Sequence, residues 1–395
     1  MDIFGITQAQ MEQRKARHTL GEIRQQPDTW RKTWVQIREN KKALEDFLAP
    51  VLSQSDFDLI FTGAGTSEFV GNTLFRALAR KYGHRVKSYG TTDIVPAPEC
   101  HLSREKPTLL VSFGRSGNSP ESVGAVDAAN VVCKNLWHLF ITCNPEGELS
   151  KRGAGSDRCF VLNLTPETND QAFAMTSSFT NMYLAAYLAF HLDRLDALEE
   201  KLAAVHKGAE AFLTDGWRSA AHIVEAFPFQ RIVYLGTAEL KGVAQESALK
   251  MLELTAGQVV TMHDSPMGFR HGPKSVIDND TLVVLYVSDD PYLRKYELDL
   301  LKEVGSQRKK NQVAVVCNTP CAEAEAWADH LVTIGTGEGQ DNALLALEYV
   351  LFAQTMGVLK SLALDITPDN PCPTGEVNRV VTGVTLYPYQ LEGTV

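Results

Sequence analysis

The sequence predicts an α/β protein built from two similar domains, each a parallel sheet flanked by helices. Strand-length apolar runs alternate along the chain with helix-length amphipathic segments, which is the pattern of parallel sheets. The segment GTSEFVG at residues 65–71 also recurs as GTAELKG at residues 236–242, each time directly after an apolar strand. Such an internal repeat indicates two copies of one domain.

The domain boundaries follow from this repeat. Residues 1–50 belong to neither copy, and Trp30 and Trp34 recur there at helical spacing, so we expect an N-terminal helical arm. We place the first domain at residues 51–215. The second domain would occupy residues 216–395 and include a C-terminal tail.

The elements are expected in the following order. Apolar runs predict strands in the first domain at residues 58–62, 108–113, 136–142 and 160–164, and in the second at 231–235, 281–287, 312–317 and 330–334. Amphipathic or long apolar segments predict helices at residues 67–82, 192–227 and 341–362. Gly83 would end the first of these as a C-terminal cap.

Composition narrows the function classes. The 395 residues carry a net charge of −10, which argues against nucleic acid as the main partner. No basic segment followed by an apolar stretch opens the chain, and no apolar run approaches the roughly 20 residues of a membrane span. The seven cysteines form no Cys-x-x-Cys pair. We therefore expect a cytoplasmic protein with reduced thiols, no metal and no other cofactor.

A candidate phosphate site lies in the first domain. The strand at 108–113 runs into GRSGNSP at residues 114–120, where Ser119 followed by Pro120 predicts a helix start. Backbone N–H groups and the helix dipole at such a start favour an anion. Similar hydroxyl-bearing turns occur at Ser67 and at 176–178. We assign phosphate binding to Ser67, Arg115, Ser116, Ser119, Thr176 and Ser177.

The alternative is that these residues only cap helices. The repeat argues against it, because the alignment of the two copies replaces Ser67 by Ala238, and Asp289 and Asp290 follow the corresponding strand of the second copy. Two carboxylates would repel a phosphate, so one copy alone would keep the anion site. Neither a dinucleotide fingerprint nor a Gly-Lys-Ser/Thr motif is present, which favours a small phosphorylated metabolite.

Candidate acid/base residues lie in the second domain. At 100° per residue, Glu246, Lys250 and Glu253 share one narrow helix face, which could also be a solvated, salt-bridged face. His271 precedes Gly272 and Pro273 and could be an ordinary loop histidine. Its ordinary pKa near 6.5 nevertheless suits proton transfer at neutral pH.

Together these motifs resemble the sugar isomerase (SIS) superfamily. The resemblance is closest to the galactosamine-6-phosphate deaminase/isomerase family, also known as tagatose-6-phosphate ketose/aldose isomerases, and covers nearly the whole chain. The motifs that carry it are GTS at 65–67, SFGRSGNS at 112–119, FAMTSS at 173–178, ESALKMLE at 246–253, DSPMGFRHGPK at 264–274 and VNRVV at 377–381.

The resemblance implies two flavodoxin-like SIS domains and a role for each acid/base residue. Glu253 would move the proton between C2 and C1 of the open-chain sugar. His271 would assist ring opening, reaching the active site of a partner subunit in a homodimer or larger homo-oligomer. Glu246 and Lys250 would orient groups or stabilise the enediol-like intermediate.

The tail departs from the pattern of related amino-sugar isomerases, in which a lysine closes the site. The last lysine here is Lys360, and the tail offers Arg379 instead. Because an arginine does not readily lose its proton, Arg379 could clamp an anion or a hydroxyl but could not act as a base.

The expected reaction is conversion of D-galactosamine 6-phosphate to D-tagatose 6-phosphate and ammonia. Two alternatives stay within the same class: isomerisation of a neutral hexose phosphate, and deamination of glucosamine 6-phosphate, which differs only at the C4 hydroxyl. A third is a non-catalytic sugar-phosphate-binding regulator, which the retained Glu253 and His271 and the absence of a basic recognition helix disfavour.

Overall fold

A computed structural model describes residues 2–335, 339–381 and 383–391 of the chain. Its contacts divide the chain into two compact units, which we describe separately. The β1–β5 unit comprises Asp28–Asp170, Ser177–Leu195 and Gly375–Val395, and the β6–β10 unit comprises Met1–Pro27, Gln171–Thr176 and Asp196–Thr374. The tail therefore groups with the first sheet, whereas the sequence analysis attaches it to the second domain.

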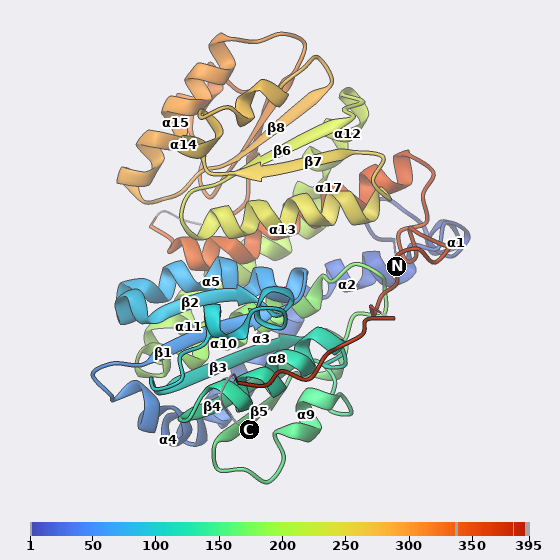
Figure 1. Ribbon diagram of the computed structural model, residues 1–395. Helices are drawn as coiled ribbons and strands as arrows, with labels where there is room; N and C mark the ends of the chain where they lie inside the picture. Colours follow the sequence, from blue (N-terminus) through green and yellow to red (C-terminus); the bar gives the residue numbers. More distant parts are fainter. Residues whose placement is uncertain (1, 336–338, 382, 392–395) are drawn as a thin grey trace. The chain divides into compact units, whose positions relative to one another are not determined.

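Each unit contains one parallel sheet, five-stranded within the described residues (Figure 1). The first sheet has the order β2-β1-β3-β4-β5, and the second, read from its other edge, has the same order, β7-β6-β8-β9-β10. This is the flavodoxin-like strand order. The predicted α/β fold of two similar domains is confirmed. The strands are β1 Asp58–Gly63, β2 Val86–Gly90, β3 Thr108–Gly114, β4 Leu136–Thr142, β5 Cys159–Asn163, β6 Arg231–Leu235, β7 Val260–Asp264, β8 Thr281–Tyr286, β9 Gln312–Cys317 and β10 His330–Thr333.

Helices connect the strands and cover both faces of each sheet (Figure 1). The α-helices are α1 Gln8–Gln13, α2 Arg17–Arg24, α3 Gln26–Glu39, α4 Lys41–Leu52, α5 Thr66–Tyr82, α6 Thr91–Ile94, α7 Pro98–His101, α8 Pro120–Val132, α9 Glu148–Arg152, α10 Ser177–Ala189, α11 Leu195–Ala211, α12 Trp217–Ala226, α13 Glu239–Leu254, α14 Pro266–Phe269, α15 Pro291–Ser306, α16 Ala322–Glu325 and α17 Asn342–Ala363. Shorter 3-10 or π turns are η1 Gly83–Arg85, η2 Pro166–Thr168, η3 Leu192–Arg194, η4 Phe212–Gly216 and η5 Pro273–Val276.

All eight predicted strands are present with ends within one residue of the expectation. The sequence analysis missed β2 and β7. Both lie at a sheet edge, and most of their side chains are only half-buried. An edge strand of this kind needs no continuous apolar run, which is why the pattern gave no signal.

Side chains that alternate between the two faces of the central strands explain how the first sheet is covered by helices on both sides. Ile60 and Leu110 pack with Ala125 of α8, whereas the next residue, Phe61, approaches Gly71 of α5. Successive strand residues point to opposite faces of a sheet, so α5 and α8 lie on opposite faces of the first one.

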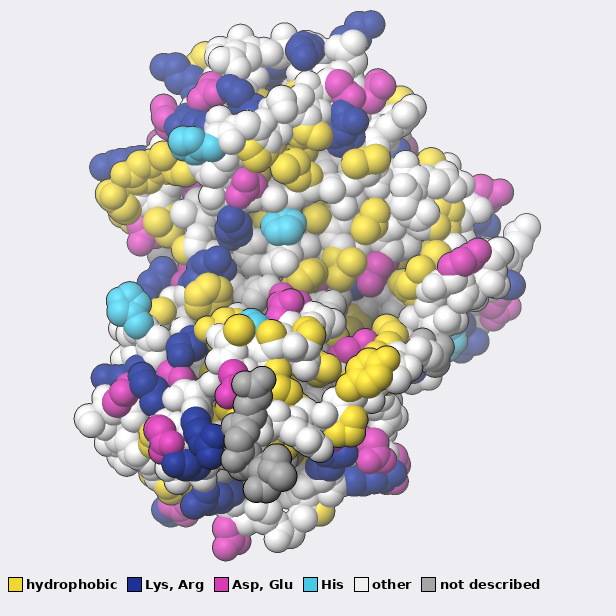
Figure 2. Space-filling view, viewed as in Figure 1, with side chains coloured by type: hydrophobic (Ala, Val, Ile, Leu, Met, Phe, Trp, Pro, Cys, Tyr) yellow, Lys and Arg dark blue, Asp and Glu magenta, His cyan; other side chains and the backbone are white. Residues whose placement is uncertain are grey.

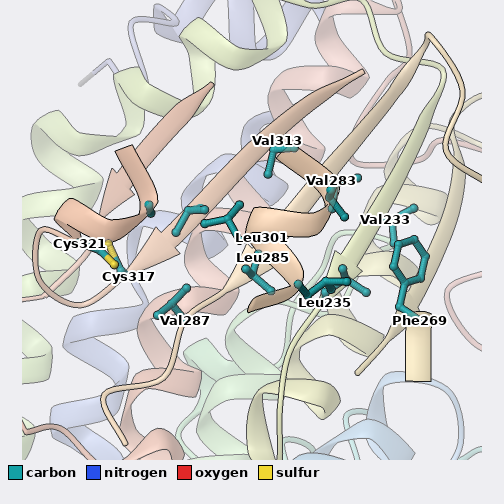
Figure 3. Packing of buried hydrophobic residues seen from close by; sticks show 14 residues of the cluster. Val233, Leu235, Phe269, Val283, Leu285, Val287, Leu301, Val313, Cys317 and Cys321 are labelled. Atoms are coloured by element: carbon teal, nitrogen blue, oxygen red, sulfur yellow. The ribbon is translucent and has the colours of Figure 1, made fainter. Parts of the chain in front are cut away.

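The second sheet has its own core against α15. Val233, Val283, Leu285 and Val313 pack with Leu301 and its neighbours in this cluster (Figure 3). α13 and α17 pack against one another, and α13 contacts β6 and β7. α17 is apolar and long enough to cross a membrane by length and composition, but it is 94% buried in the fold and serves as a core helix.

The predicted alignment of the two copies is wrong by two residues. A Cβ on Gly63 would lie 2.4 Å from the backbone carbon of Ser67, and a Cβ on Gly236 would lie 2.2 Å from the backbone oxygen of Leu240. The two glycines therefore hold equivalent positions, each four residues before the helical residue it approaches. Leu240, not Ala238, is the counterpart of Ser67, and the second copy still lacks that hydroxyl.

Candidate active site

The predicted helix start after β3 is present. Ser119 is the N-cap of α8 and Pro120 its first residue. Among the described contacts, the Ser119 hydroxyl accepts no capping hydrogen bond from the first turn of α8. The alternative, in which this side chain only caps the helix, is therefore not supported. The first turn of α8 directs backbone N–H groups and the positive end of the helix dipole towards the loop at 114–119.

A neighbouring loop that sequence reasoning missed holds the loop at 114–119 in place. The side-chain amide of Asn144 donates to the carbonyl of Ser116 at 2.9 Å, and the backbone N–H of Glu148 donates to Oδ1 of Asn118 at 2.9 Å. Within the loop, the N–H of Asn118 donates to the Ser116 hydroxyl at 3.3 Å. The adjacent Asn, Pro and Gly residues at 144–147 signal a turn, but nothing in the sequence tells which loop this turn supports.

Arg115 is buried in this loop, with 6% of its surface exposed. Its Nη2 donates to the backbone carbonyl of Arg379 at 2.8 Å. The Arg379 guanidinium in turn donates to the carbonyl of Asp170 from Nε at 3.0 Å and to Oδ1 of Asn169 from Nη2 at 3.1 Å. The two arginines are thus linked within the β1–β5 unit, and Arg379 binds the protein's own acceptors.

Ser67 lies in the first turn of α5, directly after β1, and is buried. β1 and β3 are adjacent parallel strands, with Thr62 opposite Ser112. The turns that follow them, which carry Ser67 and Ser116, consequently lie at the same edge of the sheet. This is the edge at which open α/β sheets bind ligands.

The third predicted hydroxyl turn is arranged differently. The buried carboxylate of Asp170 accepts hydrogen bonds from the N–H groups of Ser177 at 3.1 Å and Ser178 at 2.8 Å, and from the Ser178 hydroxyl at 2.6 Å. An internal anion therefore already occupies the start of α10, and any contact of Ser177 with phosphate would have to come from its hydroxyl. Thr176 is buried and belongs to the β6–β10 unit.

In the second copy, acidic side chains occupy the corresponding positions. Asp290 caps α15 by accepting from the N–H groups of Tyr292 and Leu293, and Asp289 pairs with Arg294 at 3.1 Å. Glu297 accepts from the N–H of Ser288 at 2.8 Å, and burial raises the pKa of this carboxyl to about 7. These groups supply acceptors where an anion needs donors, which supports the expectation of a single phosphate site.

The candidate acid/base residues of α13 form an ion-pair cluster that is largely buried. Lys250 Nζ lies 3.4 Å from Glu246 Oε1 and 2.5 Å from Glu253 Oε2. The side chains of Glu246 and Lys250 are fully buried, whereas that of Glu253 is 23% exposed. The solvated helix face weighed as an alternative is therefore wrong, and Glu253 is the one side chain of these three that is partly exposed.

His271 lies on the surface of the β6–β10 unit, between α14 and η5. Its N–H donates to the carbonyl of Gly268 at 2.9 Å, and the preceding Arg270 pairs with Asp299 and Glu303 of α15, both at 2.8 Å. The loop is thus fixed on α15, and His271 is exposed.

The fold and these two groups of residues define a protein of two SIS domains. The SIS domain family model matches residues 51–192 and 228–362, which are the segments that carry the two sheets.

Relatives extend the match to nearly the whole chain. A protein of Shewanella, named D-galactosamine-6-phosphate deaminase AgaS, is 41% identical over 97% of this chain and 95% of its own length. The crystal structure of tagatose-6-phosphate ketose/aldose isomerase from Escherichia coli is 38% identical, with a TM-score of 0.87 over 95% of this chain and 97% of that one. A crystal structure from Clostridium novyi NT is 41% identical, with a TM-score of 0.95 over 98% of this chain and 100% of that one. The chain belongs to this family of SIS-domain sugar-phosphate enzymes.

Proposed function

We propose that the protein converts D-galactosamine 6-phosphate and water to D-tagatose 6-phosphate and ammonia. The observation that carries this proposal is the buried cluster on α13, in which Lys250 pairs with Glu246 and with the partly exposed Glu253. The relative named as a galactosamine-6-phosphate deaminase, which matches this chain almost end to end, supports the choice of substrate.

The chemistry assigns one task to each group. The sugar ring opens to an aldehyde at C1, with His271 assisting the proton transfers of that step. Glu253 then removes the proton from C2 and returns it to C1, which converts the aldehyde carbon to a CH2OH group and the C2 amine to an imine. Water adds to the imine carbon and ammonia leaves, so the product is the 2-ketose.

A carboxylate suits the proton transfer between carbons because one oxygen can both accept and return the proton. A positioned general base of this kind contributes roughly 10²–10⁴-fold to rate. The neighbouring Lys250 ammonium stabilises negative charge near the carboxylate, whether this charge rests on Glu253 or on the oxygen of the intermediate. Glu246 holds the ammonium in place from the other side.

Phosphate binding falls to the β1–β5 unit. Hydroxyls of Ser67, Ser116 and Ser119 lie at turns on one edge of the sheet, beside the start of α8. A phosphate dianion would accept hydrogen bonds from these hydroxyls and from N–H groups of the first turn of α8. Arg115 adds a positive charge to the same loop.

A second candidate is aldose–ketose isomerisation without loss of nitrogen, which the name of the Escherichia coli structure favours. Deamination of glucosamine 6-phosphate is a third. A single experiment separates them: ammonia and ketose phosphate are measured in parallel from galactosamine 6-phosphate and glucosamine 6-phosphate. Ammonia from the galacto epimer alone supports the proposal, whereas ammonia mainly from the gluco epimer, or ketose formation without ammonia, contradicts it.

We also propose a cytoplasmic homo-oligomer with a small-molecule substrate. All seven cysteines are free thiols, which suits a reducing compartment. On the visible face of Figure 2, basic and acidic side chains are interspersed and form no extended basic patch. Light scattering of the purified protein would measure the oligomeric state, and a monodisperse monomer that is fully active would contradict it.

A further inference from the structure

Within the described residues 375–381 and 383–391, the C-terminal tail contacts the β1–β5 unit at two places. At the near anchor, Arg379 donates to the carbonyl of Asp170 and to Oδ1 of Asn169. At the far anchor, Tyr389 and Leu391 pack against the apolar cluster beside α8, and the Tyr389 hydroxyl donates to Glu99. The tail is therefore bound to the surface of this unit at both anchors.

The near anchor touches the phosphate loop. Arg115, which lies between Gly114 and Ser116 in that loop, donates from Nη2 to the Arg379 carbonyl at 2.8 Å. A single tail residue thus binds the loop through its backbone and the turn at 169–170 through its side chain.

The same turn fixes the start of α10. The Asp170 carboxylate accepts hydrogen bonds from the N–H groups of Ser177 and Ser178. The backbone carbonyl of Asp170 accepts a separate hydrogen bond from Arg379. A continuous set of hydrogen bonds consequently runs from Arg115 through Arg379 and Asp170 to the two serines. It joins the loop before α8 to the start of α10, the two places that the sequence analysis assigned to phosphate binding.

We propose that Arg379 is a positioning residue: by joining Arg115 to the turn at 169–170, it makes the phosphate affinity of the loop at 114–119 depend on the bound tail. Arg379 itself touches neither the phosphate nor the reacting carbons. This inference rests on the phosphate-binding role in the proposed function and adds to it a link between the tail and substrate affinity.

The physical basis is preorganisation. A free arginine side chain samples many rotamers, and ordering it when an anion binds lowers affinity. The Arg379 carbonyl holds Arg115 before the anion arrives. Without the Arg379 side chain, the carbonyl to which Arg115 donates is no longer fixed to the turn at 169–170, and we expect affinity to fall by about tenfold.

The test measures binding of inorganic phosphate by calorimetry to four full-length proteins: wild type, Arg379→Ala, Arg379→Lys and Tyr389→Phe. Arg379→Ala should weaken phosphate binding by about tenfold and raise KM for the sugar phosphate by a similar factor, with kcat within about threefold. Arg379→Lys should fall between, because an ammonium can donate to the Asp170 carbonyl but lacks the planar fork of the guanidinium. Tyr389→Phe removes only the hydroxyl of the far anchor and should match wild type.

Amide hydrogen exchange of the ligand-free proteins gives a second readout. Exchange at 114–119 and at Ser177 and Ser178 should rise in Arg379→Ala and not in Tyr389→Phe. Unchanged phosphate affinity in Arg379→Ala, or a fall in kcat at constant KM, would overturn the inference, as would a wild-type protein that binds no phosphate. Phosphate binding that depends on Arg379 in a protein that forms no ammonia would instead overturn the proposed function and leave the inference standing.

Discussion

The Nζ atom of Lys250 lies 2.5 Å from Oε2 of Glu253, one helical turn along α13. Lys250 is fully buried and also pairs with the fully buried Glu246. Burying one cation with two carboxylates is costly in desolvation and contributes little net stability to a fold. The cluster places the lysine ammonium beside Glu253, the one carboxylate of the pair that remains partly exposed.

Removal of the cation should destabilise the protein. We expect Lys250→Met to lower the free energy of unfolding by about 3 kcal/mol, since it takes the ammonium away from the buried carboxylate of Glu246. The Glu246→Gln/Lys250→Met double variant should recover part of this loss, because the amide carries no charge. Urea unfolding of both variants checks this, and a double variant less stable than Lys250→Met would contradict it.

The corrected alignment of the two copies gives a matched pair of predictions. Gly65 and Ala238 precede α5 and α13 with nearly identical backbone angles, φ 55° and ψ −127° against φ 52° and ψ −121°. This region favours glycine. Ala238→Gly should therefore stabilise the protein by about 1 kcal/mol, and Gly65→Ala should destabilise it by about the same amount.

A steric clash does not contribute to the effect of Gly65→Ala, because a Cβ on Gly65 would meet no atom within 4 Å. Denaturant unfolding of the two variants beside wild type measures both effects. Shifts of the same sign in the two variants would show that backbone strain is not the cause.

Stability should depend on pH through Glu297. Burial raises its pKa from 4.5 to about 7, with Asp290 adding to the rise and Arg294 opposing it. The folded state thus keeps the proton over a range in which the unfolded state releases it. Stability from this group is complete below pH 4.5 and is lost as the pH rises to about 7, a change of about 3 kcal/mol.

Glu297→Gln removes this titration. Its melting temperature should match that of wild type near pH 5 and exceed it near pH 8. Thermal unfolding of both proteins across this range measures the difference, and parallel profiles would rule out Glu297 as the titrating group.

His271 should act across a subunit interface. Mixing Glu253→Gln and His271→Ala proteins under conditions of subunit exchange would create, in each mixed dimer, one site with both native groups. With random exchange between dimers, activity should recover to about a quarter of wild type. No recovery despite exchange confirmed by mass spectrometry would place both groups in one subunit's site.

Sequence reasoning located what periodicity and local turn chemistry determine. The strands with continuous apolar runs, the Ser119–Pro120 start of α8 and the shared helix face of Glu246, Lys250 and Glu253 were all predicted, and each depends on neighbours in the chain. The structure then decided that the shared face is buried, which a helical pattern alone leaves open.

Other features depend on contacts between distant residues. Asp170 accepts hydrogen bonds at the start of α10, and the Arg379 carbonyl accepts one from Arg115, which lies 264 residues away in the sequence. Neither contact leaves a local pattern. The error in the repeat alignment has a similar origin. The sequences at 65–71 and 236–242 are alike and suggested that these segments correspond. The equivalence of Gly63 and Gly236 is visible only in the structure, where each glycine closely approaches the helix that follows it.

In the proposed reaction, Glu253 moves the proton between C2 and C1 of galactosamine 6-phosphate. The most direct measurement is ammonia release by wild type, Glu253→Gln and the exposed control Glu200→Gln, with substrate binding measured by calorimetry for each. We expect Glu253→Gln to bind substrate but to turn over at least roughly 10²-fold more slowly, while Glu200→Gln behaves as wild type. Near-wild-type ammonia release by Glu253→Gln would contradict it.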